Sequence, residues 1–157
     1  MDLTPLSIDR LVGGPGREYG VVLKAPGKTF VIYIGEPEAA AIMRELKGIS
    51  PQRPMSHDLV CNLMTAFDVS VRAVVISSLV KNIFCATLLL QGGEGAKEEE
   101  EPRSEVRLDL RASDAIIVAL KTKSPLLAAP EVVEQVEDIS HLLPDADAPP
   151  EDIGPPS

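Results

Sequence analysis

The sequence contains few of the cysteine and histidine residues that form zinc sites and disulfide frameworks. Among its 157 residues there are two cysteines, two histidines and no tryptophan. This inventory excludes a zinc site made of several histidines or cysteines, and it excludes a disulfide framework. Cys61 and Cys85 are therefore predicted to be small core residues. Serine hydrolase chemistry also has little support, because the chain has no Gly-x-Ser-x-Gly elbow.

Long apolar runs and a targeting signal are missing as well. The longest uncharged apolar stretch, Ile83–Leu90, is far shorter than the roughly 20 residues that a membrane-spanning helix needs. The start Met1-Asp2-Leu3 lacks the basic region of a signal peptide. From these two absences we expect a soluble cytoplasmic protein with no membrane partner.

Basic residues are outnumbered, and the net charge is −9. An acidic total argues at first against nucleic acid, because phosphate binding normally requires a basic surface. The excess, however, is concentrated in two segments. Residues 131–157 contain eight acidic residues and no basic one, and residues 94–101 contain five acidic residues and one lysine. The rest of residues 1–130 has 14 basic and 11 acidic residues, a net charge of +3, so charge does not exclude nucleic acid.

Composition also predicts the domain boundaries. The chain is 45% hydrophobic, enough for one core in a single domain over residues 1–142. A run of four glutamates between glycines and a proline predicts a solvated acidic loop at 92–103. Residues 143–157 contain five prolines and no basic residue, which predicts a disordered acidic tail.

The first half of the chain predicts three strands and then two helices. A β-branched hairpin surrounds Pro26-Gly27-Lys28, with strands at Tyr19–Ala25 and Thr29–Ile34, after an opening strand at Leu6–Val12. A helix over Glu36–Lys47 is predicted to bury Ala39, Ile42, Met43 and Leu46. A second helix over about 57–67, with Ser56 as its N-cap, is predicted to bury Val60, Leu63, Met64 and Phe67.

The second half repeats this order. Apolar runs at Val69–Leu79 and Ile83–Gln91 predict strands covered on both faces. Glu105–Leu110 alternates, which predicts a half-buried strand with Val106, Leu108 and Leu110 on the core. A helix follows, starting at Arg111 or Ser113 and running through Lys121, and a last helix starting at Pro130 is predicted to bury Val132, Val136 and Ile139.

The two halves align with a shift of 76 residues, although identities are few. We therefore predict an α+β fold in which duplicated β-β-β-α-α halves form one curved, barrel-like mixed sheet flanked by helices.

Two short polar clusters lie at predicted helix starts. They are Arg53-Pro54-Met55-Ser56-His57-Asp58 and Asp109-Leu110-Arg111-Ala112-Ser113-Asp114. Each combines an arginine, a hydroxyl and a carboxylate where free backbone N–H groups favour an anion. His57 adds a side chain that transfers protons near neutral pH. The structural alternative is that these residues cap helices and form ion pairs.

The same clusters resemble motifs of the bifunctional nuclease domain family. The resemblance runs in the family's order over about residues 3–140. Its matching segments are Tyr33–Ala39, Arg53–Leu59, Ile83–Leu88, Asp109–Leu120 and Ser124–Leu126. Among the departures, Ser56 stands where the family has threonine and Ala112 where it has proline. The resemblance implies a duplicated α+β fold and nuclease activity on RNA and DNA. The polar residues matching the family's motifs are Glu38, Arg53, His57, Asp58, Arg111, Ser113 and Asp114.

The leading hypothesis is phosphodiester hydrolysis of RNA or DNA. It assigns catalysis to His57, Asp58 and Asp114, and phosphate binding to Arg53, Arg111 and Ser113. Glu38, Asp58 and Asp114 are the candidate ligands of a divalent metal, Mg²⁺ or Mn²⁺, provided that they converge.

The alternative is a non-catalytic regulatory module that binds a nucleotide or phosphate at the same helix starts. Apolar sheet faces also leave a homo-oligomer open.

Overall fold

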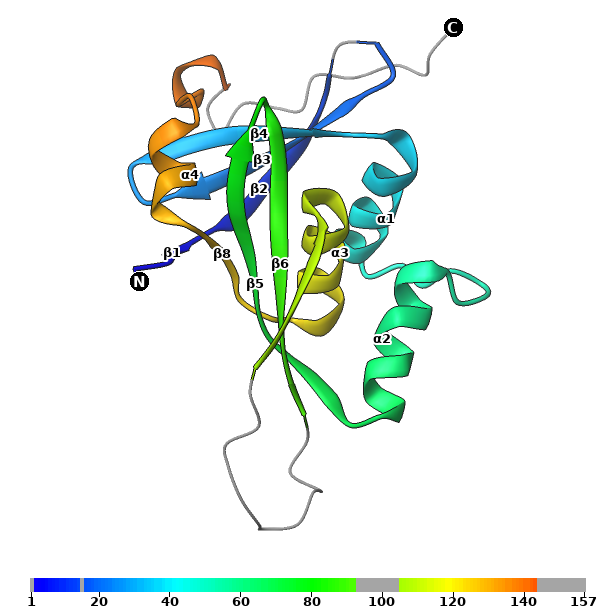
Figure 1. The fold of residues 1–157 in the computed structure, drawn as a ribbon. Helices are drawn as coiled ribbons and strands as arrows, with labels where there is room; N and C mark the ends of the chain where they lie inside the picture. Colours follow the sequence, from blue (N-terminus) through cyan, green and yellow to red (C-terminus); the bar gives the residue numbers. More distant parts are fainter. Residues whose placement is uncertain (1, 15, 93–104, 144–157) are drawn as a thin grey trace, which may run out of the picture.

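The strands form two separate sheets in the computed structural model, which describes residues 2–14, 16–92 and 105–143 (Figure 1). The smaller is an antiparallel sheet of β2 (Ser7–Gly13), β3 (Tyr19–Ala25) and β4 (Lys28–Ile34). The larger is a mixed sheet with the order β1 (Thr4–Pro5), β8 (Leu126–Ala128), β5 (Val69–Val80), β6 (Ile83–Gly92) and β7 (Val106–Arg111). The predicted α+β class is confirmed.

The prediction of one continuous barrel-like sheet differs from this arrangement. β8 enters parallel beside β5, with Val75 opposite Leu127, and β1 then pairs with β8. The outer edge of β4 is bonded to the C-terminal segment instead of to a strand. The Ile139 N–H donates to the Thr29 carbonyl at 2.8 Å, and the Thr29 N–H donates to the Asp138 carboxylate at 3.0 Å. Short segments thus cover β8 in the larger sheet and β4 in the smaller one, and neither of these strands pairs with a strand of the other sheet.

Helices α1 (Glu36–Lys47) and α3 (Ala112–Thr122) follow the predicted ranges closely and pack against each other. α3 is the central helix, with Ala115, Ile116 and Ile117 fully buried beneath the sheets. On α1, Ala39 and Ile42 are buried as predicted, but Met43 and Leu46 are exposed. The predicted acidic loop and tail fall almost entirely on residues outside the described ranges.

The last helix is shorter than the sequence predicts. α4 (Pro130–Gln135) ends where Val136 takes an extended conformation, and only a short 3₁₀ turn at Ser140–Leu142 follows. Val132 and Val136 are nevertheless buried, while Ile139 is half-buried. Both cysteines are half-buried and neither forms a disulfide.

Helix α2 (Ser56–Ala66) differs most from its prediction. Its N-cap is Met55, not Ser56, and the Met55 N–H donates to the Asp58 carboxylate at 2.8 Å. No residue of α2 is buried. Val60, Leu63 and Phe67 are exposed rather than forming a buried stripe, because α2 packs on α3 and β5 through its other face. Much of the apolar surface of this helix is therefore in solvent.

The outer face of the smaller sheet requires a glycine on β3. A Cβ atom on Gly20 would lie 2.7 Å from a methyl of Val31 and 2.9 Å from a methyl of Val12. We expect Gly20→Ala to lower the free energy of unfolding by about 1–3 kcal/mol, because both methyls belong to stiff β-branched side chains. Urea unfolding measures the difference. Gly13→Ala is the control, since a Cβ at Gly13 meets no atom within 4 Å.

Candidate functional site

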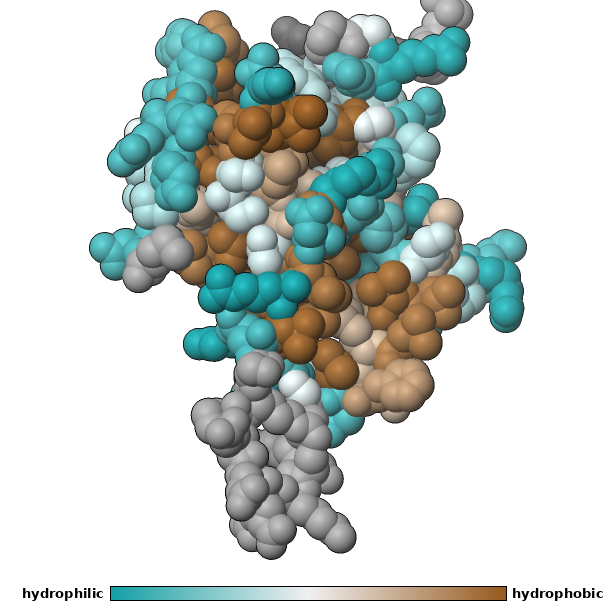
Figure 2. All heavy atoms as spheres, in the orientation of Figure 1, coloured by the Kyte–Doolittle hydropathy of each residue, from teal (hydrophilic) through white to brown (hydrophobic). Residues whose placement is uncertain are grey.

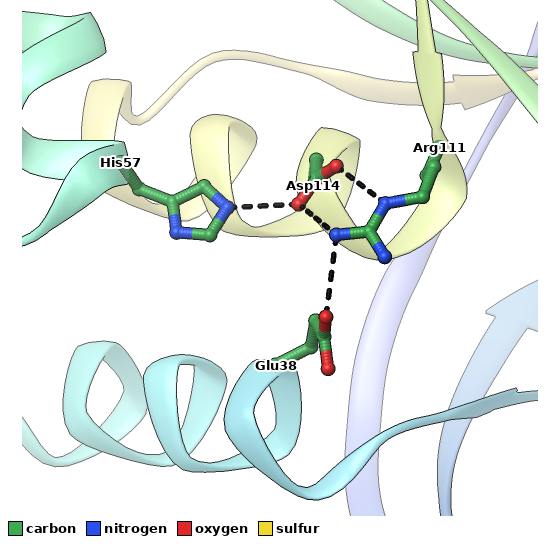
Figure 3. Close-up of polar contacts among 4 residues, drawn as sticks. All are labelled: Glu38, His57, Arg111 and Asp114. Carbon is green, nitrogen blue, oxygen red and sulfur yellow. Dashed lines mark hydrogen bonds and ion pairs between the residues drawn. The ribbon is translucent and has the colours of Figure 1, made fainter.

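Four polar side chains from four elements meet at the start of α3 (Figure 3). Glu38 comes from α1, His57 from α2, Arg111 from the end of β7 and Asp114 from the first turn of α3. The structure therefore joins the two polar clusters of the sequence, which are separated by more than fifty residues. These four residues are called the Arg111 cluster below.

Asp114 holds the ring of His57. The His57 Nε2 atom lies 2.9 Å from Asp114 Oδ1, and both side chains are about one quarter exposed. Because a carboxylate accepts hydrogen bonds, this contact favours the tautomer with its proton on Nε2. The Nδ1 atom of His57 is then the basic nitrogen that can take a proton.

Arg111 is held by two carboxylates. Its Nε atom donates to Asp114 Oδ2 at 2.8 Å, and its Nη2 atom donates to Asp114 Oδ1 at 3.1 Å and to Glu38 Oε1 at 3.2 Å. Burial alone would raise the pKa of the Asp114 carboxyl, but the hydrogen bonds from Arg111 and His57 outweigh it and lower that pKa. Asp114 first, and Glu38 after it, raise the pKa of Arg111. The Asp114 carboxylate and the Arg111 guanidinium therefore both stay charged.

Asp58 belongs to a different group of side chains. It pairs with Lys121 of α3, and the Lys121 Nζ atom also donates to Glu45 of α1 at 2.5 Å. The hydrogen bond from Lys121, and then that from the Met55 N–H, lower the pKa of Asp58. Lys121 thus ties α1, α2 and α3 together, and the Asp58 carboxylate is occupied away from Asp114.

The remaining candidate residues differ in placement. Ser113 lines a cleft beside Arg111, whereas Arg53 is exposed in the loop before α2 and makes no side-chain hydrogen bond or ion pair within the described ranges. The proposed metal ligands Glu38, Asp58 and Asp114 are not brought together as one set. In the part of the chain that the structure describes, no group of three or more histidine, cysteine or acidic side chains is arranged to hold a metal ion.

Two clefts flank the Arg111 cluster. One, of about 460 Å³, lies between β4, the start of β6 and the start of α3 and includes Tyr33, Glu38, Arg111 and Ser113. The other, of about 510 Å³, lies between α2, β7 and α3. His57, Arg111 and Asp114 line one part of it, and Val60 and Leu108 are among its apolar lining residues. Arg111 borders both clefts and is 67% exposed, so it is accessible to a ligand in either.

Sequence reasoning missed Lys121 and Glu45, which determine the position of Asp58. The available signal was the lysine itself, because it follows a run of apolar residues in a helix whose middle turns are fully apolar. A lysine that is withdrawn from water beside a buried helix is usually paired with a carboxylate. Nothing in the sequence, however, indicated which acidic residue would supply it.

The fold and this cluster define an α+β protein with a histidine, carboxylate and arginine site at the start of its central helix. Residues 21–140 match the bifunctional nuclease domain, and the chain belongs to that family. It is 32% identical over 114 residues to uncharacterized proteins of Mycobacterium tuberculosis strains H37Rv and CDC 1551. The match covers 73% of this chain and 60% of the length of each relative. Among the described helices, none has the length and apolar character needed to cross a membrane.

Proposed function

We propose that this protein hydrolyses phosphodiester bonds in RNA or single-stranded DNA, with the Arg111 cluster as its active site. Membership of the bifunctional nuclease domain family supports the type of reaction. The observation that carries the assignment to this site is the 2.9 Å contact between His57 and Asp114, beside an accessible arginine. A histidine oriented by a carboxylate is a common general base, and arginine is a common phosphate ligand.

Each member of the cluster has a distinct role in this proposal. The Nδ1 atom of His57 takes the proton from the attacking oxygen, which belongs to water or, in RNA, to the ribose 2′-hydroxyl. As this oxygen bonds to phosphorus, the P–O bond to the leaving sugar oxygen breaks, and that oxygen takes a proton from water. Asp114 stabilises the imidazolium ion that results, as in other histidine and carboxylate pairs. Arg111 contacts the phosphate through its Nη1 edge, which makes no hydrogen bond within the described ranges. Glu38 and Asp114 fix the plane of the guanidinium group.

Mg²⁺ or Mn²⁺ as a cofactor stays a prediction. The carboxylates of Glu38 and Asp114 both bind Arg111, and Asp58 binds Lys121. In this arrangement they do not fit a single divalent ion, because it would have to displace two cations from their partners. No step of the proposed reaction is therefore routed through a metal.

A nucleotide-binding module without catalysis is the second candidate. The observation in its favour is the cleft of about 460 Å³ beside Ser113 and Arg111, at the N-terminus of α3. Glu38 and Asp114 offset the charge of Arg111. Arg111 therefore attracts a phosphate less strongly, which suits reversible binding as well as hydrolysis. A thermal-shift series with nucleotides would show stabilisation without turnover if this function were correct.

The two histidines allow a matched test of the nuclease proposal. We expect His57→Ala to reduce cleavage of labelled RNA and single-stranded DNA by about 10²–10⁴-fold, because the general base is lost. His141→Ala, which removes an exposed histidine on the 3₁₀ turn after α4 that is no member of the Arg111 cluster, should leave the rate unchanged. Equal rates for the wild type and His57→Ala would show that the activity does not come from this site.

A further inference from the structure

Strand β7 is an exposed edge strand. It ends the larger sheet, and no other segment of the described chain pairs with its outer edge. Five of its six residues are exposed, including Val106 at 51% and Leu108 at 47%. The alternating pattern of the segment predicts both on the core, but the structure places them in solvent. An exposed edge strand with apolar residues tends to pair with another strand.

Apolar surface continues from β7 to α2. Val60 and Leu108 line the same cleft, Leu59 and Leu63 are exposed on α2, and Phe67 is exposed at the C-cap of this helix. Figure 2 shows this hydrophobic surface in the lower half of the molecule, where α2 lies beside the larger sheet. A helix with apolar residues on its solvent face usually has a partner that covers them.

The charges along β7 are complementary to themselves when the strand is reversed. The segment from 105 to 111 reads Glu, Val, Arg, Leu, Asp, Leu, Arg, so its odd positions alternate in sign. In an antiparallel pair of two such strands centred on Leu108, Arg107 lies opposite the partner's Asp109. Glu105 then lies opposite the partner's Arg111. Opposite charges facing each other across a strand pair are stabilising.

The even positions match in the same register. Leu108 lies opposite the partner's Leu108, and Val106 lies opposite the partner's Leu110. Moving the centre by one residue still places apolar side chains opposite each other, but it removes the charge match. Centred on Arg107, the pair would place two arginines opposite each other and Glu105 opposite the partner's Asp109. Centred on Asp109, it would place two aspartates together and Arg107 opposite the partner's Arg111. Of the registers that keep the apolar positions opposite each other, the one centred on Leu108 gives the most pairs of opposite charge.

We propose that the protein forms a two-fold symmetric dimer in which β7 pairs antiparallel with β7 of a second copy, centred on Leu108. The larger sheets of the two copies become one continuous sheet across this axis. The contact is self-complementary, as a two-fold interface requires. It gives Asp109 a cationic partner, which this carboxylate lacks in the described part of the single chain. The partner's apolar side chains also extend the hydrophobic surface beside α2.

The mass of the full chain in solution tests the dimer. Sedimentation equilibrium is expected to give twice the chain mass of 16.8 kDa for the wild type. Arg107→Asp is expected to give the chain mass, because it places two aspartates across the strand pair. Asp109→Arg is expected to do the same through two arginines. The double variant Arg107→Asp with Asp109→Arg restores opposite charges and is expected to dimerise again.

The rescue distinguishes the proposed register from other contacts. Arg17→Asp is the control for the same charge reversal at an exposed residue outside β7, and it should stay dimeric. Circular dichroism of each variant shows whether the fold is intact. A wild type that stays monomeric at its highest soluble concentration would overturn the proposal. A dimer that persists in both single variants, or that the double variant does not restore, would overturn the register and the interface.

Discussion

Asp114→Asn is expected to reduce the rate of phosphodiester cleavage by about 10³-fold, a loss of about 4 kcal/mol of transition-state stabilisation. Asp114 accepts hydrogen bonds from both His57 and Arg111 in the structure. An asparagine presents a neutral amide, which neither stabilises a histidine cation nor fixes the tautomer with its basic nitrogen on Nδ1. The loss should therefore appear in kcat more than in KM.

A measurement of kcat against pH gives a second readout for Asp114. The pKa of Asp114 is lowered, so in the wild type its carboxylate stays ionised until the pH falls below the ordinary aspartate range. The asparagine variant has no carboxylate at this position. Its residual kcat should therefore show no fall at low pH that comes from protonation of residue 114. Asp68→Asn is the control, because Asp68 has a φ of 54° that asparagine also tolerates. Unchanged kcat in Asp114→Asn would contradict the proposed role.

Lys121→Met is expected to lower the free energy of unfolding by about 1–3 kcal/mol. The Lys121 side chain is only 12% exposed and pairs with Asp58 and Glu45 on two other helices. Methionine keeps the length of the side chain but leaves two carboxylates facing each other without a cation. The expected loss lies between that for a surface ion pair and that for a fully buried one, because both carboxylates retain some contact with water.

The pH dependence of stability identifies the cause. The pKa of Asp58 is lowered by Lys121, so in the wild type the pair stabilises the fold above the ordinary aspartate pKa. This contribution is lost as the pH falls through the lowered pKa. Urea unfolding should therefore show a large difference between wild type and variant at neutral pH, and a smaller one in acid. Lys47→Met, at an exposed lysine of α1, should show neither effect. A difference that is constant with pH would point to packing alone.

The fold was predictable from the sequence wherever local pattern determines structure. The hairpin of β3 and β4 turns at Pro26-Gly27, where Gly27 has a φ of 76° that favours glycine. The range of α1 follows from its proline at the start and Gly48 at its end. Strand β8 was not predicted, because three residues after a proline show no periodicity. It forms because its ends bond to β5: the Val74 N–H donates to the Pro125 carbonyl, and the Ile76 carbonyl accepts from the Ala129 N–H.

The site was predictable in part, because both polar clusters were recognised as helix starts. Their residues were nevertheless grouped by sequence distance. His57 and Asp58 are neighbours in the chain, but a helix turns successive side chains by about 100°, so they point to different partners. His57 contacts Asp114 and Asp58 contacts Lys121. Sequence alone could not separate them.

The sequence by itself determined the family, the α+β class and the residue types at two helix starts, because these depend on local spacing and ordered motifs. The tertiary structure decided which carboxylate meets His57, which one meets Lys121, and that β7 and α2 keep apolar side chains in solvent. Amphipathic periodicity shows that an element has an apolar face. It does not show whether another part of the same chain covers that face, since this depends on contacts between residues far apart in sequence.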